Sequence, residues 1–544
     1  MDALVVLIPL FPLIAAAIIG TGHLFGILDG EASETMTAGI AGWAITMSCM
    51  LALTLLGADL LGLNADSSAV GQWLGSGNLN IQMTFITTGF SVLLATLFAI
   101  LLFIIIRFSV NYLHREAGFH RFFFLLSLFA SAMLLLVLSG NAIGTFIGWE
   151  IAGLCSYLLI AYAYDRPVAA FNATRVFVTN RIGDAGFILG MGLSYTWAKG
   201  LDWSQINALS TQLTGGQASA IAFCFAVAAF AKSAQIPFAP WLARAAEGPT
   251  PSSAGFYGAI MVHAGVYLML LLQPIFERTP LIMALVAAVG LLTAVYGFVA
   301  GLTQTDVKSS LFFSTSGQLG LMFLECGLGF WELASWHLCA HAVVRGYQVL
   351  TAPSLMHYIL GNPIKPVERE IAGLRWVYVA SLQRFWMDQI TDWALVKPVR
   401  RLAHDLAYFD DHVIDRVMGI PLPSLRTIST LAQMEKQKIA TRQSLYASLG
   451  VVGNLTQPGK HKIVMPPENQ DNDFARGSGF AGNLTQRVTA ILYWFEDRLV
   501  IRGIGEDMID YGRRLGFAAN KIERLLLNPG YLALFVAIIL LVAL

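Results

Sequence analysis

Residues 142–164 read AIGTFIGWEIAGLCSYLLIAYAY, an apolar run that contains one charged side chain, Glu150. About 20 mostly apolar residues suffice to cross the hydrocarbon core of a bilayer as an α-helix. A charge is costly there, so a carboxylate must find a cation or take up a proton. The stretch therefore predicts a membrane helix and makes Glu150 a candidate functional residue. The alternative is a structural Glu bonded only to backbone or hydroxyl groups.

The composition of the whole chain agrees with a membrane protein. Of its 544 residues, 56% are hydrophobic and 12% are charged, and 34 Lys and Arg balance 34 Asp and Glu. Soluble domains carry about 25% charged residues. The composition excludes a secreted soluble enzyme, a disordered protein and a dedicated nucleic-acid binder, which would need a basic excess. The five cysteines lie in apolar runs without CxxC, and no glycine-rich phosphate-binding motif occurs, so we predict no cofactor.

Apolar runs of spanning length recur along the chain. We predict an all-α fold, a polytopic membrane helical bundle of about twelve spans that includes broken helices. The first run has no basic segment before it, and we interpret it as a membrane helix rather than a cleaved signal peptide. The predicted spans cover residues 3–21, 37–63, 83–106, 121–139, 142–164, 174–196, 218–235, 252–274, 281–302, 309–329, 332–350 and 529–544.

The character of the sequence changes near residue 360. We predict a transmembrane core at 1–360, a polar and amphipathic extension at 361–528 and a C-terminal transmembrane helix at 529–544. Within the extension, 371–396 is aromatic and amphipathic, which suits either a span or a helix at the membrane interface. The segment 487–526 mixes apolar and charged residues at helical spacing, as in helices that lie along a membrane. We expect the extension to dock a partner or to lie against lipid.

Lys232 is a second charge inside an apolar helix, in the sequence FAKSAQIP (230–237). Pro237 and Pro240 lack backbone donors and should break the helix close to this lysine. A broken helix at membrane depth is tolerated only where it is buried in protein or lines a cavity. A lysine in such a place can load and release protons. We therefore expect Glu150 and Lys232 to form a switchable pair.

Three histidines and an arginine extend this polar set. His337, His341 and Arg345 are spaced i, i+4, i+8 and share one helix face. His263 lies in another apolar run, where it is either a structural histidine or a proton carrier. Two His at i, i+4 could bind a metal, but no third ligand is offered nearby. We favour a polar path through the membrane over a metal site.

Two further charged pairs complete the candidates. Asp306 and Lys308 precede a polar stretch of helix, and we expect residues 304–308 to cap or line a helix break. Arg181 and Asp184 lie at i, i+3 in the run 174–196 and should partly neutralise each other.

These residues match a known pattern. The run GWE at 148–150, followed by GLCSYLLI at 153–160, resembles the signature of subunit L of NADH:quinone oxidoreductase (complex I) and its antiporter-like relatives. The resemblance covers about residues 80–355, while 384–418 and 490–544 look more loosely like the family's tail. Other matching segments are NRIGD at 180–184, AKSAQ at 231–235, GPTP at 248–251 and QTDVK at 304–308.

The resemblance implies an antiporter-like fold and a role for each matching polar residue. Glu150 and Lys232 would be the paired proton-channel residues, and the polar axis at mid-membrane would run through His263, His337 and His341. Two positions depart from the family pattern. Arg345 stands where a lysine is usual, and arginine stays charged and so cannot relay a proton. Tyr257 stands where the family usually has a histidine.

The chain also lacks the later spans and second channel lysine of subunit L. The shortened form, with TAPS at 351–354 directly after the His341 helix, resembles the DabB family. DabB is the membrane subunit of the DAB inorganic-carbon accumulation complex and partners DabA, a large soluble zinc protein. The resemblance implies a multi-pass protein of a bacterial inner membrane, with a cation gradient driving CO2 to bicarbonate in the partner.

Two other functions fit the sequence. The chain could be a proton-pumping subunit of complex I or of a membrane hydrogenase, or a structural scaffold with a degenerate channel. It offers no cluster of catalytic side chains, so we do not expect it to be an enzyme by itself. The sequence leaves open whether the ion is H+ or Na+.

Overall fold

The structure, a computed structural model, describes residues 2–76, 79–304, 306–359 and 373–414. The chain divides into two compact units, Met1–Val396 and Lys397–Leu544, and each is described by itself. The first unit contains all the candidate residues named above. Of the second, the structure describes the helix α19 (Lys397–Phe409) and the π-helical turn Asp410–Ile414.

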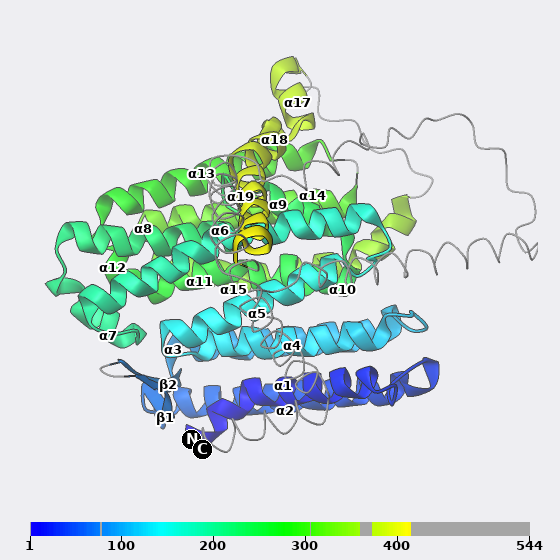
Figure 1. Cartoon of the computed structure of the whole chain (residues 1–544), viewed down its shortest axis with the longest axis horizontal. Coiled ribbons are helices and arrows are strands. Elements are labelled where there is room, and N and C mark those ends of the chain that lie inside the picture. The colour runs from blue at the N-terminus through cyan, green and yellow to red at the C-terminus, as the bar shows by residue number, and fades with distance from the viewer. Residues whose placement is uncertain (1, 77–78, 305, 360–372, 415–544) are drawn as a thin grey trace, which may run out of the picture. The chain divides into compact units, whose positions relative to one another are not determined.

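Long helices make up the first unit and pack side by side (Figure 1). Its first half contains α1 (Asp2–Leu24), α2 (Glu34–Leu60), β1 (Ser67–Ser76), β2 (Leu79–Ile86), α3 (Gly89–Tyr112), α4 (Phe119–Leu138), α5 (Ala142–Ile160) and α6 (Pro167–Ala198). Its second half contains α7 (Trp203–Ala208), α8 (Gly215–Lys232), α9 (Pro240–Arg244), α10 (Thr250–Ser253), α11 (Ala264–Leu271), α12 (Gln273–Phe276), α13 (Pro280–Leu302), α14 (Val307–Gly327), α15 (Trp331–Ile359), α17 (Arg375–Leu382) and α18 (Met387–Thr391).

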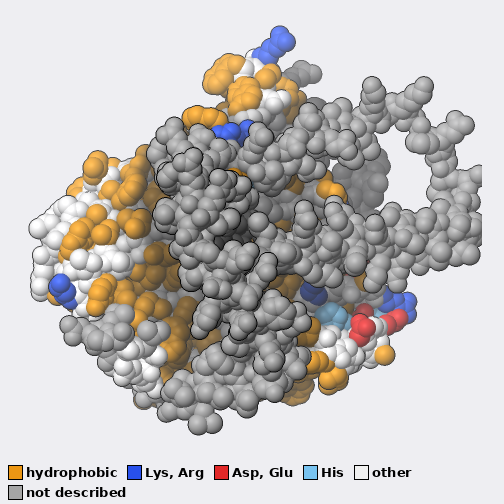
Figure 2. Space-filling model, viewed as in Figure 1, with side chains coloured by type: hydrophobic (Ala, Val, Ile, Leu, Met, Phe, Trp, Pro, Cys, Tyr) orange, Lys and Arg blue, Asp and Glu red, His pale blue; other side chains and the backbone are white. Residues whose placement is uncertain are grey.

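The architecture confirms the all-α polytopic prediction. Within the described residues, 8 helices are long and apolar enough to cross a membrane. Large apolar side chains remain exposed on them, among them Trp43 and Leu281, and Figure 2 shows hydrophobic side chains over much of the described surface. Such a surface suits lipid rather than water. The predicted span 529–544 and the amphipathic segment 487–526 lie outside the described residues.

Three long helices are not among these 8, although spans were predicted at their positions. They are α6, α14 and α15, which correspond to the predicted spans 174–196, 309–329 and 332–350. All three carry charged side chains, which lowers their hydropathy. Because buried polar residues in membrane helices are usually functional, these helices are where a polar site is expected.

One predicted span begins in the wrong place. Residues 83–86 of the predicted span 83–106 belong to strand β2, which pairs antiparallel with β1, and the helix α3 begins only at Gly89. Polar and apolar residues alternate along β2, which is the period of a strand. The side chains of two apolar residues of β2, Ile81 and Phe85, are buried in the core. Hydropathy averaged over a window of residues does not distinguish this alternating strand from the apolar helix that follows, so the predicted span began too early.

Glycines allow helices to approach closely. A β-carbon at Gly297 of α13 would lie 2.5 Å from the backbone nitrogen of Gly317 and 2.6 Å from the carbonyl oxygen of Phe313, both on α14. Such contacts with backbone cannot be relieved by rotating a side chain. Small residues at these positions let α13 and α14 pack backbone to backbone, as is common between membrane helices.

The predicted break near Lys232 is confirmed. Helix α8 ends at Lys232, Ala234 has a positive φ of 52°, and α9 begins at Pro240. The indole nitrogen of Trp241 donates to the carbonyl oxygen of Ala231 at 2.8 Å, which satisfies one of the acceptors freed at the end of α8. The break is therefore held in a defined shape.

A second broken helix faces the first. Between α10 and α11 the chain forms a π-helical turn, Ala254–Ala259, and a 3₁₀ turn, Met261–His263. His263, expected in mid-helix, therefore lies at a junction. The hydroxyl of Ser233 in the first break donates to the carbonyl oxygen of Val262 at 2.6 Å. The two interrupted segments thus lie against each other inside the bundle.

The segment after residue 372 does not form a single span. The helix α17 covers Arg375–Leu382 only, and a left-handed turn separates it from α18. An 8-residue helix is about 12 Å long, well short of a bilayer. The segment instead packs on the helical core, where the hydroxyl of Ser381 donates to the carbonyl oxygen of Val299 on α13 at 2.8 Å.

Candidate functional site

Glu150 is paired with an arginine. Arg181 on α6 contacts the Glu150 carboxylate on α5 in a close ion pair, and its other terminal nitrogen lies 2.8 Å from Asp184 Oδ2. The indole nitrogen of Trp149 donates to Asp184 Oδ1 at 2.8 Å. Arg181 and Asp184 neutralise each other as expected, but the same guanidinium also bridges to Glu150.

The Lys232 ammonium group makes a different set of contacts. The residue is 1% exposed, and its Nζ donates to the carbonyl oxygen of Trp149 at 2.8 Å and lies 5.0 Å from the centroid of the Trp149 ring. The structure thus corrects the expected direct pair, because the ion-pair partner of Glu150 is Arg181. The reason is geometric: Lys232 ends α8 beside the Trp149 carbonyl, whereas the long Arg181 side chain reaches Glu150 from α6.

Arg181 and Lys232 nevertheless converge on one point. A β-carbon at Gly153 would lie 3.3 Å from Arg181 Nη2 and 3.3 Å from Lys232 Nζ. A small cavity of about 10 Å³ opens there. Its polar lining includes Ser156, Asn180, Arg181 and Lys232. A space of this size is near the minimum that holds one water molecule, and the lining offers enough polar partners for it.

A second polar group surrounds His341. The Nε2 atom of His263 lies 2.9 Å from Nδ1 of His341. Arg345 donates from Nε to Nε2 of His341 at 3.4 Å, and from Nη2 to the Ser314 hydroxyl at 2.8 Å. Because Arg345 can only donate, His341 Nε2 must accept, and its Nδ1 then carries the proton that it donates to His263.

His337 continues this group toward α14. Its ring lies 6.3 Å from the His341 ring, centroid to centroid. Its Nδ1 lies 2.9 Å from Glu325 Oε1 and its Nε2 lies 2.9 Å from Gln318 Oε1. Glu325 was not among the residues predicted from the sequence. Like Glu150, it is a lone carboxylate in an apolar run, LMFLECGLGF (321–330), so the same argument could have found it.

Tyr257 is linked by its hydroxyl group to the cavity beside Lys232. Its ring is buried, and its hydroxyl lies 2.9 Å from the Ser156 hydroxyl, which lines the cavity beside Lys232. Ser156 is on α5, and Tyr257 belongs to the same broken helix as His263. The tyrosine thus connects the lysine cavity to the histidine-bearing segment through hydroxyl groups.

Asp306 and Lys308 have local roles at helix ends. Asp306 accepts from the Ser309 backbone nitrogen at 2.7 Å and caps α14. Lys308 Nζ donates to the carbonyl oxygens of Ala246 and Gly248, each at 2.9 Å. These bonds fix the loop that precedes α10. The expected cap is present, while Lys308 ties two loops together rather than joining the groups around Lys232 or His341.

Among the residues that the structure describes, no three His, Cys, Asp or Glu side chains gather closely enough to hold a metal ion. The arrangement consists instead of buried ionisable groups in two clusters, joined where the two helices are interrupted.

Two known families match the sequence. The transmembrane family of NADH:quinone oxidoreductase and Mrp antiporters matches residues 139–366, and the family of the N-terminus of complex I chain 5 matches residues 73–123. The first of these matches includes the motifs around Glu150, Lys232 and His341.

Curated relatives show the same likeness. The NAD(P)H-quinone oxidoreductase chain 5 of Synechocystis sp. is 36% identical over 382 residues, which cover 68% of this chain and 55% of the relative. The chloroplastic NAD(P)H-quinone oxidoreductase subunit 5 of Mesostigma viride is 33% identical over 387 residues, which cover 68% of this chain and 58% of the relative. The chain spans little more than half the length of these relatives.

Solved structures agree with the sequence matches. A chain of the Mrp complex from Dietzia sp. DQ12-45-1b is 26% identical with a TM-score of 0.58, covering 65% of this chain and 38% of that chain. A chain of the membrane-bound sulfane sulfur reductase, an archaeal respiratory complex, shares the fold, with a TM-score of 0.55 at 20% identity over 64% of this chain and 70% of that chain. The chain is a multi-pass membrane protein of the complex I subunit 5/Mrp antiporter-like family.

Proposed function

We propose that this protein is the proton-pumping, antiporter-like membrane subunit of a multi-subunit complex of the complex I or Mrp type. One observation carries the proposal: ionisable groups extend from Glu150 to His337 around two interrupted helices that contact each other, and Lys232 and His263, which lie at the two breaks, are fully buried. Buried charges are costly in a membrane protein and are usually retained for transport. Broken helices at that depth also expose backbone groups that a moving ion can use.

Lys232 is the proposed switch. Its ammonium group is held by a carbonyl oxygen and an indole ring, not by a direct ion pair. It can therefore give up a proton without separating two opposite charges. The fixed Arg181 guanidinium holds Glu150 and Asp184 in place while this happens.

The histidines are the proposed relay. From Lys232, a proton would pass the small cavity and the hydroxyls of Ser156 and Tyr257 to reach the segment that bears His263. A neutral imidazole accepts a proton on one nitrogen and releases one from the other. His341 donates to His263 in this structure, so the pair carries a proton further once the His341 ring turns and presents a free nitrogen. Arg345 keeps its proton and acts only through its charge and its hydrogen bonds.

Replacing the switch tests the proposal. In the purified complex reconstituted into liposomes, Lys232→Ala should lower gradient-driven ion movement by about 100-fold or more, because a proton-transfer group is lost, while the complex stays assembled. Lys397→Ala removes an exposed lysine of α19 and is the matched control. If the Lys232→Ala complex moved ions at the control rate, the proposed ion-pumping function would be refuted, and the structural scaffold with a degenerate channel would remain. Repeating the assay with H+ or Na+ as the sole gradient identifies the ion.

A second candidate is the inorganic-carbon function, in which a DabA-like zinc partner converts CO2 to bicarbonate at the expense of the ion gradient. Arg345, at a position where lysine is expected, favours it, together with the TAPS stretch at 351–354. The names of the related proteins favour the first candidate. In either case we expect a bacterial inner membrane. Purifying the complex separates the two candidates: a large zinc protein supports the second, and flavin or iron–sulfur subunits support the first.

A further inference from the structure

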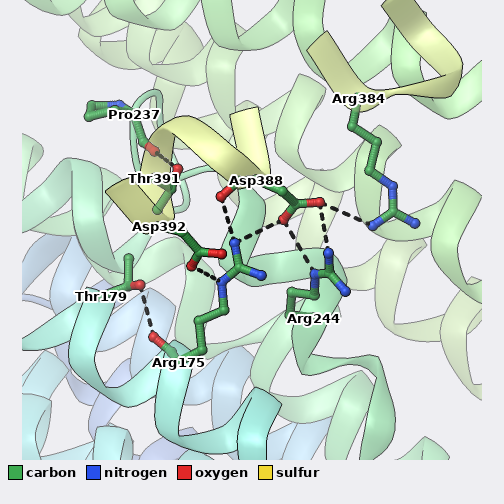
Figure 3. A network of polar contacts seen from close by, with 8 residues as sticks. All are labelled: Arg175, Thr179, Pro237, Arg244, Arg384, Asp388, Thr391 and Asp392. Carbon is green, nitrogen blue, oxygen red and sulfur yellow. Dashed lines mark hydrogen bonds and ion pairs between the residues drawn. The ribbon is translucent and has the colours of Figure 1, made fainter. Parts of the chain in front are cut away.

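Asp388, at the start of α18, accepts from two arginines and lies beside a third (Figure 3). Arg244 of α9 binds both carboxylate oxygens, from Nη2 to Oδ2 at 3.0 Å and from Nε to Oδ1 at 3.3 Å. Arg175 of α6 lies 3.4 Å from Oδ1 and also donates to the Asp388 carbonyl oxygen at 2.7 Å. Arg384 lies 3.7 Å from Oδ2. One carboxylate therefore joins three chain segments that are far apart in sequence.

The network is shielded from solvent at its centre. The Arg175 side chain is 6% exposed and that of Asp388 is 14% exposed. Arg175 Nε also pairs with Asp392 Oδ1 at 2.8 Å. Breaking one member of such a group leaves charges buried without a partner, which is far more disruptive than losing a pair at the surface.

The chain reaches Asp388 through a strained turn. The three residues Arg384, Phe385 and Trp386 have φ values of 52°, 53° and 54°. Side chains disfavour this left-handed conformation, and it persists only where the surroundings impose it. Phe385 packs against Tyr296 with 6.2 Å between ring centroids, and the Arg384 guanidinium lies over the ring of Phe313 at 5.3 Å. The turn is thus held in place by α13 and α14.

The network contacts the break that follows Lys232 and the helix after it. The hydroxyl of Thr391 donates to the carbonyl oxygen of Pro237, inside the break, at 2.9 Å. Arg244 belongs to α9, directly after the break, and Arg175 lies on α6, the helix that carries Arg181. Asp388 and its neighbours therefore tie α6, α9 and the break itself to one another.

We propose that Asp388 is a positioning residue, which holds the α8–α9 break in the shape that keeps Lys232 against Trp149. This inference rests on the proposed function of Lys232. It assigns the segment 384–392 a part in ion movement, although the segment contributes no group to the path itself. The left-handed turn, which α13 and α14 hold in place, sets the Asp388 carboxylate against Arg175 and Arg244, and these contacts fix the break.

Hydrogen exchange measured on the assembled complex tests the proposal directly. Asp388→Asn keeps the size of the side chain but cannot accept from the arginines as a carboxylate does. We expect backbone amides of 233–244 to exchange about 100-fold faster and ion movement to fall. Asp388→Glu, which keeps the charge, should restore most of both properties, and Asp410→Asn, an exposed carboxylate of the second unit, should change neither.

The outcomes separate positioning from a merely local role. If exchange rises only in 384–392 and stays at the original rate in 233–244, Asp388 anchors its own segment and the proposal is wrong. If Lys232→Ala moves ions normally, the proposed function fails, while exchange across the break still decides the role of Asp388. Should Asp388→Asn not assemble, Arg244→Lys keeps the charge but loses the two-point contact. Faster exchange in 233–244 of that variant supports the proposal, and unchanged exchange refutes it.

Discussion

Arg181 offers the sharpest test of how the lysine cluster is built. Removing one partner of a buried ion pair costs about 3–5 kcal/mol, whereas an exposed pair contributes about 0.2–1 kcal/mol. The Asp184 side chain is 5% exposed, but Glu150 and Arg181 are 25% and 30% exposed. A glutamine also keeps a donor. We therefore expect Arg181→Gln to destabilise the folded subunit by about 2–3 kcal/mol, between the two limits.

The same free energy sets the expected loss of ion movement. A destabilisation of about 2–3 kcal/mol corresponds to about a 30- to 150-fold change in an equilibrium between correct and incorrect placements of the two carboxylates. Thermal melting of the purified complex and ion movement in liposomes measure the two effects, with Arg107→Gln, an exposed arginine of α3, as the control.

A double variant shows whether Arg181 acts through its carboxylates. Removing both members of a buried pair is less costly than removing one, so Arg181→Gln with Asp184→Asn should melt at a higher temperature than Arg181→Gln alone. Equal melting temperatures for the single and double variants would refute the bridging arrangement.

Two further predictions concern single hydrogen bonds. Tyr257→Phe removes the hydroxyl bonded to Ser156. This should slow ion movement about 10-fold while lowering stability by only about 1 kcal/mol. An unchanged rate in liposomes would exclude the hydroxyl from the path. Asp306→Ala removes the cap of α14 and should lower stability by about 1 kcal/mol, whereas Asp306→Asn should melt like the original protein. Equal melting of the two Asp306 variants would contradict the capping role.

The helices and their breaks were predictable because their causes are local. Apolar length predicts each span, and Pro237 and Pro240 predict the end of α8, since proline cannot continue a helix. The period of a strand is equally local, so the start of the span at residue 83 could have been corrected by the alternation in β2. Domain limits depend on packing between distant segments, and the predicted boundary at 360 stays a prediction.

The partners of the buried charges were less predictable. The i, i+3 spacing of Arg181 and Asp184 shows that they can pair, but not that Arg181 has a second terminal nitrogen free to reach Glu150 on another helix. Asp388 lies 144 residues from Arg244 and 213 from Arg175. No spacing rule connects such positions, and a segment described as aromatic and amphipathic gave no reason to look for a buried carboxylate.

The charges on the proposed path give it a direction. Around Lys232, two carboxylates face Arg181 and the protonated lysine, so the charges balance, and loss of the lysine proton leaves one excess negative charge that draws a proton back. Beyond the breaks, a proton on His341 lies next to the fixed charge of Arg345 and is repelled by it. His337, beside the Glu325 carboxylate, is the favourable place for that proton. Arg345 thus replaces a relay group with a fixed charge that repels a proton from His341 toward Glu325. Glu325→Gln removes the carboxylate that stabilises the proton on His337, so it should slow ion movement in liposomes, and an unchanged rate would contradict this direction.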